Sequence, residues 1–220
     1  MSSPLKAITN NSKKAKSVKN RFKIALIALS VAAWVGSAYA IPMELTLFDG
    51  TTTVSVTDGG TGDSNPLAGV ITWIGSIGNW TINVSTAISD KPTGVSYMDV
   101  NSVNASSSAG GTLTITLQDG PFNEVGGVST EIGGTTTGTV TYSTSFTGPI
   151  TYGPGAFSGT DSGAVAADPY DMMQTIVINH TGKGLSSFDA TVSVPDGGLT
   201  VAFLGFAVMG VEGLRRRLSR

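Results

Sequence analysis

The sequence of 220 residues contains no cysteine and a single histidine, His180. Without cysteine, a disulfide framework, thiolate zinc ligands and a catalytic thiol are excluded, and one histidine excludes a multi-histidine metal site. Basic residues are almost absent from the middle of the chain: between Ile41 and Val194 only Lys91 and Lys183 face thirteen carboxylates, which gives a net charge of −11. Because a phosphate partner requires a positive surface, this segment is not expected to bind nucleic acid.

The N-terminal segment has the pattern of an export signal. Residues 1–23 contain seven Lys or Arg and no acid, residues 24–35 are an apolar run, and Ala38-Tyr39-Ala40 is an A-x-A pattern. An apolar run of about 12 residues makes about 18 Å of helix, which is short for a ~30 Å hydrocarbon layer. The sequence therefore predicts a signal peptide over residues 1–40, cleaved by signal peptidase after Ala40, with Ala38 and Ala40 read by the enzyme. The alternative is an N-terminal helix that stays attached.

The C-terminal segment predicts a single membrane-spanning helix. Residues 199–214 are apolar except for Thr200 and Glu212, and a basic cluster follows: Arg215, Arg216, Arg217 and Arg220. Arginines next to an apolar span predict a cytoplasmic C-terminus. The alternative is a helix buried in the domain, but a helix apolar on all faces beside four arginines does not suit a small core.

A short motif precedes this span: Val194, Pro195, Asp196, Gly197 and Gly198. Proline lacks a backbone donor and is expected to end the preceding strand, while the glycine pair keeps the chain extended and flexible. Such a segment suits a peptidase, which binds extended and unpaired backbone.

This motif, the apolar helix and the arginine cluster together resemble the PEP-CTERM class of sorting signals, in the VPDSG-CTERM variant. The resemblance implies an exported bacterial protein that is held transiently in the inner membrane. It also implies that an exosortase, a membrane-embedded transpeptidase, recognises Val194, Pro195 and Asp196, removes the tail, and leaves the protein at the cell surface or in the extracellular matrix. Gly197 stands where the variant usually has serine, which leaves the scissile bond open.

The middle of the chain, residues 41–193, is expected to be an acidic ectodomain built of strands. Residues 41–194 include 23 Gly and 26 Thr, and no stretch keeps a helical apolar period over three turns. Short alternating runs bounded by turn residues recur instead. They predict an all-β fold, an antiparallel sandwich or jelly roll of about 8–10 strands. The expected strands are 44–48, 53–57, 70–74, 80–86, 112–118, 138–147, 175–179 and 188–193.

Alternation also predicts which side chains enter the core. Leu113, Ile115 and Leu117 share one face of their strand, with threonines on the other. Trp80, Ile82 and Val84 do the same in another strand. Most of the segment resembles a recurrent type of PEP-CTERM ectodomain, to which no activity is assigned. The resemblance rests on residues 65–71, 78–84, 109–115 and 187–191.

Candidate sites in the ectodomain are few. The loop with Asp58, Asp63 and Asn65 offers oxygen ligands of the kind that Ca²⁺ prefers, although its spacing is not that of an EF-hand and an ordinary acidic turn is the alternative. Trp73 and Trp80 are expected in the core rather than on a sugar-stacking platform, and His180 is expected to be structural or merely exposed. A glycosidase would need two facing carboxylates, and the sequence pattern places together no two of the three glutamates of this segment: Glu44, Glu124 and Glu131.

The sequence is therefore interpreted as that of a non-enzymatic surface or matrix protein, without catalytic residues and without a required cofactor. Its expected partners are signal peptidase, exosortase and the inner membrane. The alternatives are a calcium- or carbohydrate-binding surface module, which would add exopolysaccharide as a partner, and a polysaccharide-active enzyme.

Overall fold

The computed structural model describes residues 41–90 and 95–195. Contacts divide the chain into two units, residues 1–38 and 39–220, and every described residue belongs to the second. The expected signal peptide with Ala38 and Ala40, the sorting residues Asp196–Gly198, the apolar span and the arginine cluster lie outside the described residues. Within the described ranges, no helix is long and apolar enough to cross a membrane.

The described chain is built from twelve β-strands. They are β1 (Glu44–Phe48), β2 (Thr53–Thr57), β3 (Val70–Ile77), β4 (Trp80–Asp90), β5 (Val95–Ser107), β6 (Gly111–Phe122), β7 (Gly126–Thr136), β8 (Thr139–Thr144), β9 (Ile150–Tyr152), β10 (Gly155–Val165), β11 (Tyr170–His180) and β12 (Gly184–Pro195).

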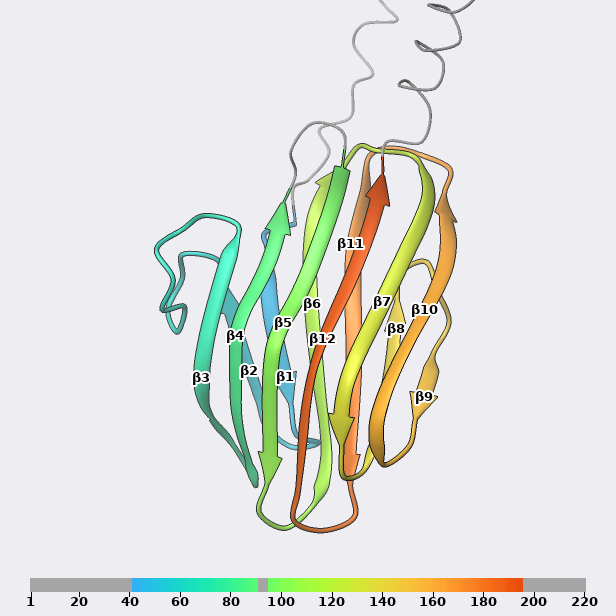
Figure 1. The fold of residues 1–220 in the computed structure, drawn as a ribbon. Helices are drawn as coiled ribbons and strands as arrows, with labels where there is room; N and C mark the ends of the chain where they lie inside the picture. Colours follow the sequence, from blue (N-terminus) through green and yellow to red (C-terminus); the bar gives the residue numbers. More distant parts are fainter. Residues whose placement is uncertain (1–40, 91–94, 196–220) are drawn as a thin grey trace, which may run out of the picture. The chain divides into compact units, whose positions relative to one another are not determined.

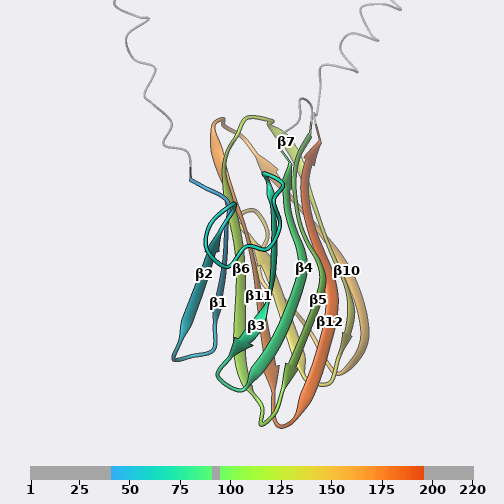
Figure 2. The ribbon, with the colours of Figure 1, turned by 90° about the vertical axis from the view of Figure 1, so that its left-hand side faces the viewer.

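These strands form two six-stranded sheets that face each other (Figures 1 and 2). Sheet A has the order β2-β1-β6-β11-β8-β9 and sheet B the order β10-β7-β12-β5-β4-β3. Every neighbouring pair is antiparallel. The all-β, antiparallel sandwich expected from the sequence is thus confirmed, with more strands than expected.

The chain passes repeatedly from one sheet to the other. Adjacent hairpins join only β1 to β2, β3 to β4, β4 to β5 and β8 to β9; the other consecutive described strands lie in opposite sheets. β1 begins and β12 ends at the same end of the sandwich (Figure 1). Because the chain alternates between the sheets, strands that are distant in the sequence become neighbours in one sheet. In sheet B, for example, β7 lies between β10 and β12.

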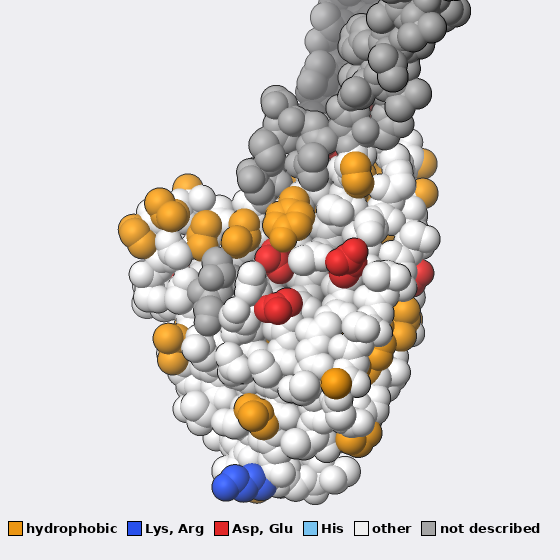
Figure 3. Space-filling view, viewed as in Figure 1, with side chains coloured by type: hydrophobic (Ala, Val, Ile, Leu, Met, Phe, Trp, Pro, Cys, Tyr) orange, Lys and Arg blue, Asp and Glu red, His pale blue; other side chains and the backbone are white. Residues whose placement is uncertain are grey.

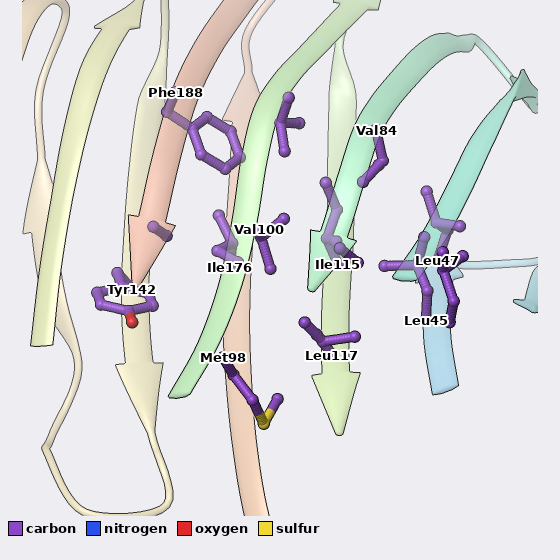
Figure 4. Close-up of a cluster of buried hydrophobic side chains, with 14 of the residues drawn as sticks. Leu45, Leu47, Val84, Met98, Val100, Ile115, Leu117, Tyr142, Ile176 and Phe188 are labelled. Atoms are coloured by element: carbon purple, nitrogen blue, oxygen red, sulfur yellow. The ribbon is translucent and has the colours of Figure 1, made fainter. Parts of the chain in front are cut away.

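The core lies between the sheets and is filled mainly by alternate residues of the longer strands (Figure 4). Leu113, Ile115 and Leu117 of β6 are fully buried, as their alternation predicts, and Trp80, Ile82 and Val84 of β4 are buried opposite them. Burial of such side chains contributes about 1.5–3 kcal/mol each to folding. The threonines between them face outward, which explains how a chain so rich in threonine still has an apolar interior.

The strands β5, β7, β9 and β10 were not among those expected from the sequence. Many of their outward positions are glycine, serine, threonine or asparagine, and some inward positions are also small or polar, such as Thr130 and Gly134 of β7. A strand can be recognised from sequence alternation only when its inward-facing residues are large and apolar. These strands form because their neighbours in the sheet supply partners along their whole length.

Candidate functional site

The loop between β2 and β3, which carries the expected calcium ligands, is held together by their side chains. The Asp63 carboxylate accepts hydrogen bonds from the backbone N–H groups of Gly59 (3.0 Å), Asn65 (2.9 Å) and Thr72 (3.0 Å). Burial raises the pKa of Asp63, but these backbone hydrogen bonds outweigh it and hold the pKa below its ordinary value. Asn65 Oδ1 in turn accepts from the N–H of Leu67 at 3.0 Å.

These contacts attach the loop to the edge of sheet B. β3 is the last strand of that sheet, and its residue Thr72 donates its N–H to Asp63, while its carbonyl oxygen accepts from the N–H of Ser64 at 3.0 Å. An edge strand with free backbone groups invites pairing with another chain. Asp63 and Ser64 of the loop bind both backbone groups of Thr72, so Asp63 has a structural role here.

Asp58 makes different hydrogen bonds from the other two predicted ligands, Asp63 and Asn65. Its Oδ2 accepts from the N–H of Gly69 at 2.8 Å, and its buried Oδ1 has no hydrogen-bond partner. Asp58 lines a pocket of about 440 Å³ together with Asp119, whose carboxylate accepts from the Ser89 hydroxyl (2.5 Å) and the Gly120 N–H (2.7 Å). Among the described residues, no three His, Asp or Glu side chains are grouped so that they could hold a metal ion. Calcium binding at Asp58, Asp63 and Asn65 stays a prediction.

A shallow groove of about 630 Å³ lies on the outer face of sheet B, across β10, β7 and β12. Its lining includes Ser158 and Thr160 of β10, Glu131 and Gly133 of β7, and Asp189 and Thr191 of β12. The register aligns Ser158, Gly133 and Asp189 in one row across the strands, and Thr160, Glu131 and Thr191 in the next. Gly133 forms the floor, because it has no side chain between the hydroxyl on one side and the carboxylate on the other.

Acidic side chains gather on this face of the molecule (Figure 3). Next to Thr191, on β5, lies Asp99, which is only 5% exposed. Its Oδ2 lies 3.4 Å from the Asn101 side-chain amide, and its Oδ1 is buried without a partner. Burial raises the pKa of Asp99, hydrogen bonds from Tyr97 and Asn101 oppose this, and the charge of Asp189 adds to the rise. Burial and the neighbouring Asp99 charge also raise the pKa of Tyr97 to about 12.

Asp189 is fixed at a bulge between β12 and β5. The pairing shifts between Phe188 and Ala190, and the Asp189 carboxylate accepts a 2.5 Å hydrogen bond from the N–H of Ser102. Ser102 has a φ of 53°, a conformation uncommon for a residue other than glycine. This contact orients Asp189 on the outer face beside the groove.

His180 is buried at the end of β11, beside the turn that leads to β12, and has a structural role. Its Nδ1 lies 2.7 Å from the Ser107 hydroxyl and its Nε2 lies 2.9 Å from the Ser186 hydroxyl. The imidazole packs against Trp80, with ring centroids 4.9 Å apart, and burial lowers its pKa. With serines on both nitrogens and no carboxylate at either, the cluster lacks the orienting acid of a catalytic triad.

The remaining candidates do not converge on a site. Trp73 and Trp80 are buried in the core, as expected. Glu44 lies on β1 in sheet A, Glu124 follows β6 and hydrogen-bonds the Ser96 hydroxyl, and Glu131 lines the groove. The structure therefore brings none of these three glutamates together; the acid that shares the groove with Glu131 is Asp189.

Two residues of the predicted sorting motif belong to the folded sandwich. β12 includes Pro195, the last residue that the structure describes, and Val194 is fully buried in the core and pairs with Ser96. The sandwich thus continues to the middle of the motif.

Sequence reasoning missed the groove. Its outward residues, such as Glu131 and Gly133 on β7 or Asp189 and Thr191 on β12, alternate with buried ones. That alternation is the signal that could have identified them. Even so, the side-by-side placement of β7, β10 and β12 depends on sheet order, which the sequence does not display.

No family model and no curated protein matches the chain. Several solved structures show a distant likeness. A family 61 carbohydrate-binding module in complex with β-1,4-galactotriose is 9% identical, with a TM-score of 0.34, over 55% of this chain and 91% of that one. A variant of a family 29 carbohydrate-binding module complexed with mannohexaose is 11% identical, with a TM-score of 0.30, over 72% and 94%.

An enzymatically active domain of a bacteriophage CBA120 tailspike protein is 15% identical, with a TM-score of 0.31, over 51% of this chain and 19% of that one. Such identities and TM-scores give no ground for transferring a ligand or an activity.

Proposed function

We propose that this chain is an exported bacterial surface protein whose β-sandwich binds carbohydrate, without hydrolysing it, in the groove on the outer face of sheet B. The groove is the single observation that carries the proposal. It has a volume of about 630 Å³, and its lining includes three hydroxyl groups and two carboxylates over a glycine floor.

These groups match the chemistry of a sugar ring. Carboxylates accept hydrogen bonds from sugar hydroxyls, and the hydroxyls of Ser158, Thr160 and Thr191 can both donate and accept. The volume lies within the range of about 300–1,000 Å³ that small-ligand sites occupy. The supporting strands are paired along their length, so the groups are held on a rigid surface rather than on a loop.

A groove-filling substitution tests this proposal. A side chain on Gly133 would project from the floor, and its first carbon would meet no atom closer than the Phe157 carbonyl oxygen at 3.7 Å. Gly133→Val is therefore expected to fold and to weaken binding to any saccharide by about tenfold or more, measured by isothermal titration against a panel of neutral and charged oligosaccharides.

Gly127→Val is the matched control. Gly127 lies on the same strand and outside the groove, and a side chain there meets no atom within 4 Å. The proposal fails if no saccharide binds the unaltered protein, or if both variants weaken binding equally.

The alternative is a polysaccharide-active enzyme, and one feature favours it. Glu131 and Asp189 are diagonal neighbours on β7 and β12, because Glu131 pairs with Thr191 and Asp189 pairs with Gly133. Glycoside hydrolysis uses two carboxyl groups that flank the scissile bond. An assay for new reducing ends separates the two functions, since a binding module leaves its polysaccharide intact.

For the ends of the chain we propose cleavage after Ala40, C-terminal processing by an exosortase at the motif Val194–Gly198, and a final location at the cell surface or in the matrix. Support comes from the sequence pattern. Intact-mass measurement of the surface form tests this, and a chain that still ends at Arg220 in cells with active exosortase would refute the processing.

A further inference from the structure

Three carboxylates surround Thr191 on the outer face of sheet B. Asp99 of β5 and Glu131 of β7 are its direct cross-strand partners on either side, and Asp189 precedes it by two residues on the same face of β12. Neighbouring strands are about 4.8 Å apart and alternate residues about 6.8 Å, so the backbones of all three acids lie within about 10 Å of one another.

No positive group of the described chain balances these charges. The residues that line the groove include no Lys or Arg. Lys183, the one Lys or Arg in the described ranges, lies in the turn between β11 and β12, at the far end of the sheet (Figures 1 and 3). A saccharide bearing carboxylate or sulfate would be repelled here.

Asp99 adds a buried carboxylate to the negative charge of this face. Its side chain points outward, because Met98 and Val100 on either side of it are fully buried in the core. Asp99 is nevertheless buried, with only 5% of its surface exposed, and its Oδ1 accepts no hydrogen bond. A buried carboxylate without a counter-charge is costly, and the negative charge of Asp189 adds to that cost. A cation bound beside Asp189 and Thr191 would lower the cost of the buried Asp99 charge and its repulsion by Asp189.

The arrangement suits an extended cationic ligand better than a metal ion. Within the described residues, no group of three His, Asp or Glu side chains could hold a metal. The acids are instead spread over three strands and interleaved with the hydroxyls of Ser158, Thr160 and Thr191. This pattern fits a chain of rings that carries ammonium groups at intervals and hydroxyls between them.

We propose that the groove selects oligosaccharides of amino sugars with free ammonium groups; this inference rests on the proposed function of the groove in carbohydrate binding. Glu131 and Asp189 would pair with ammonium groups by charge-assisted hydrogen bonds. The hydroxyl groups of β10 and β12 would contact the sugar hydroxyls.

The test is isothermal titration of the full chain, purified in a detergent without a sugar headgroup, with two oligosaccharides of equal length. One is a β-1,4-linked glucosamine hexamer and the other its fully N-acetylated form, at a pH at which the free amines are protonated. The free-amine form is expected to bind at least tenfold more tightly and to lose most of this advantage in high salt, since exposed charges are screened.

Charge-removing variants distinguish the groove from general attraction between a polycation and an acidic protein. Asp189→Asn and Glu131→Gln are each expected to weaken binding of the free-amine hexamer about tenfold. Glu44→Gln removes the same charge on sheet A, at the opposite face, and is expected to leave binding unchanged. Equal losses in all three variants would mean non-specific attraction and would overturn the inference.

Other outcomes separate the inference from the function on which it rests. If both hexamers bind equally and Gly133→Val abolishes both, the groove binds carbohydrate but does not select ammonium groups. If neither hexamer nor any neutral saccharide binds, both ideas fail. Titration with CaCl₂ alone is expected to show no binding. If one calcium ion binds per chain and this binding is lost in Asp189→Asn, the ligand of the groove is a metal ion, and the inference of an amino sugar is overturned.

Discussion

At Asp63 a single carboxylate orders a whole loop by accepting hydrogen bonds from three backbone N–H groups, those of Gly59, Asn65 and Thr72. Such a side chain looks like a metal ligand in the sequence, because turn-forming residues and calcium ligands are the same residue types. The two roles differ in where the oxygens point, which only the fold determines.

Asp63→Ala is expected to lower the free energy of unfolding by about 1–3 kcal/mol, because three backbone donors lose their acceptor. Urea denaturation followed by tryptophan fluorescence measures this. Thr61→Ala, in the same loop, is the control and is expected to change little, since Thr61 is exposed. Equal stability of Asp63→Ala and the unaltered chain would contradict the structural role.

His180 predicts a pH dependence whose sign follows from its lowered pKa. The unfolded chain binds a proton near the ordinary pKa of about 6.5, whereas the folded chain resists it. Stability is therefore expected to be unaffected by this group above about pH 6.5 and to decline as the pH falls below it. Because the chain has one histidine, its imidazole NMR signals report the group without ambiguity. A midpoint above 6.5 would contradict the burial of His180.

At the scale of the strand, sequence patterns predicted elements with large apolar residues at alternate positions. Leu113, Ile115 and Leu117 of β6 are one example, and Trp80, Ile82 and Val84 of β4 another. Strands such as β7 and β10 could not be predicted, since glycines and threonines stand where such residues would reveal the period. Their conformation is imposed by neighbours that are distant in the sequence.

Two adjacent glycines of β7 illustrate how strand packing decides the effect of a substitution. A side chain on Gly134 would meet the Ser187 carbonyl oxygen at 2.1 Å and Phe188 Cβ at 2.6 Å, whereas one on Gly133 meets only ordinary contacts. Gly134→Ala is therefore expected to destabilise the fold by about 1–3 kcal/mol through overpacking. Gly133→Ala is expected to change stability by less, and equal unfolding midpoints for the two variants would contradict the assigned faces of β7.

At the scale of the whole molecule, the sandwich class could be predicted from the sequence, but the candidate groove could not. The class follows from short alternating runs separated by turns, and from the lack of helical periodicity. The groove follows from the sheet order β10-β7-β12-β5, which places Asp189 and Glu131 side by side although 57 intervening residues separate them in the sequence. Pairing between strands that are distant in the chain leaves no local mark.

The charge distribution is also a property of the molecule as a whole. Residues 41–193 carry nearly all of the acids, and the predicted signals at the two ends carry nearly all of the basic residues. If the proposed processing removes both ends, the mature protein is far more acidic than the full chain. Its isoelectric point is then expected to fall below the value of 5.3 for the full sequence, and isoelectric focusing of the surface form measures this. An unchanged isoelectric point would indicate that the ends are retained.

Carbohydrate binding in the groove can be tested by titrating the ¹⁵N-labelled protein with oligosaccharides and following its backbone amide NMR signals. Carbohydrate binding in the groove predicts that the shifted signals cluster on Glu131 to Gly133, Ser158 to Thr160 and Asp189 to Thr191. Signals on the outer face of sheet A, such as those of Glu44 and Thr46, are expected to stay in place. No shift with any saccharide, or shifts confined to sheet A, would contradict the account.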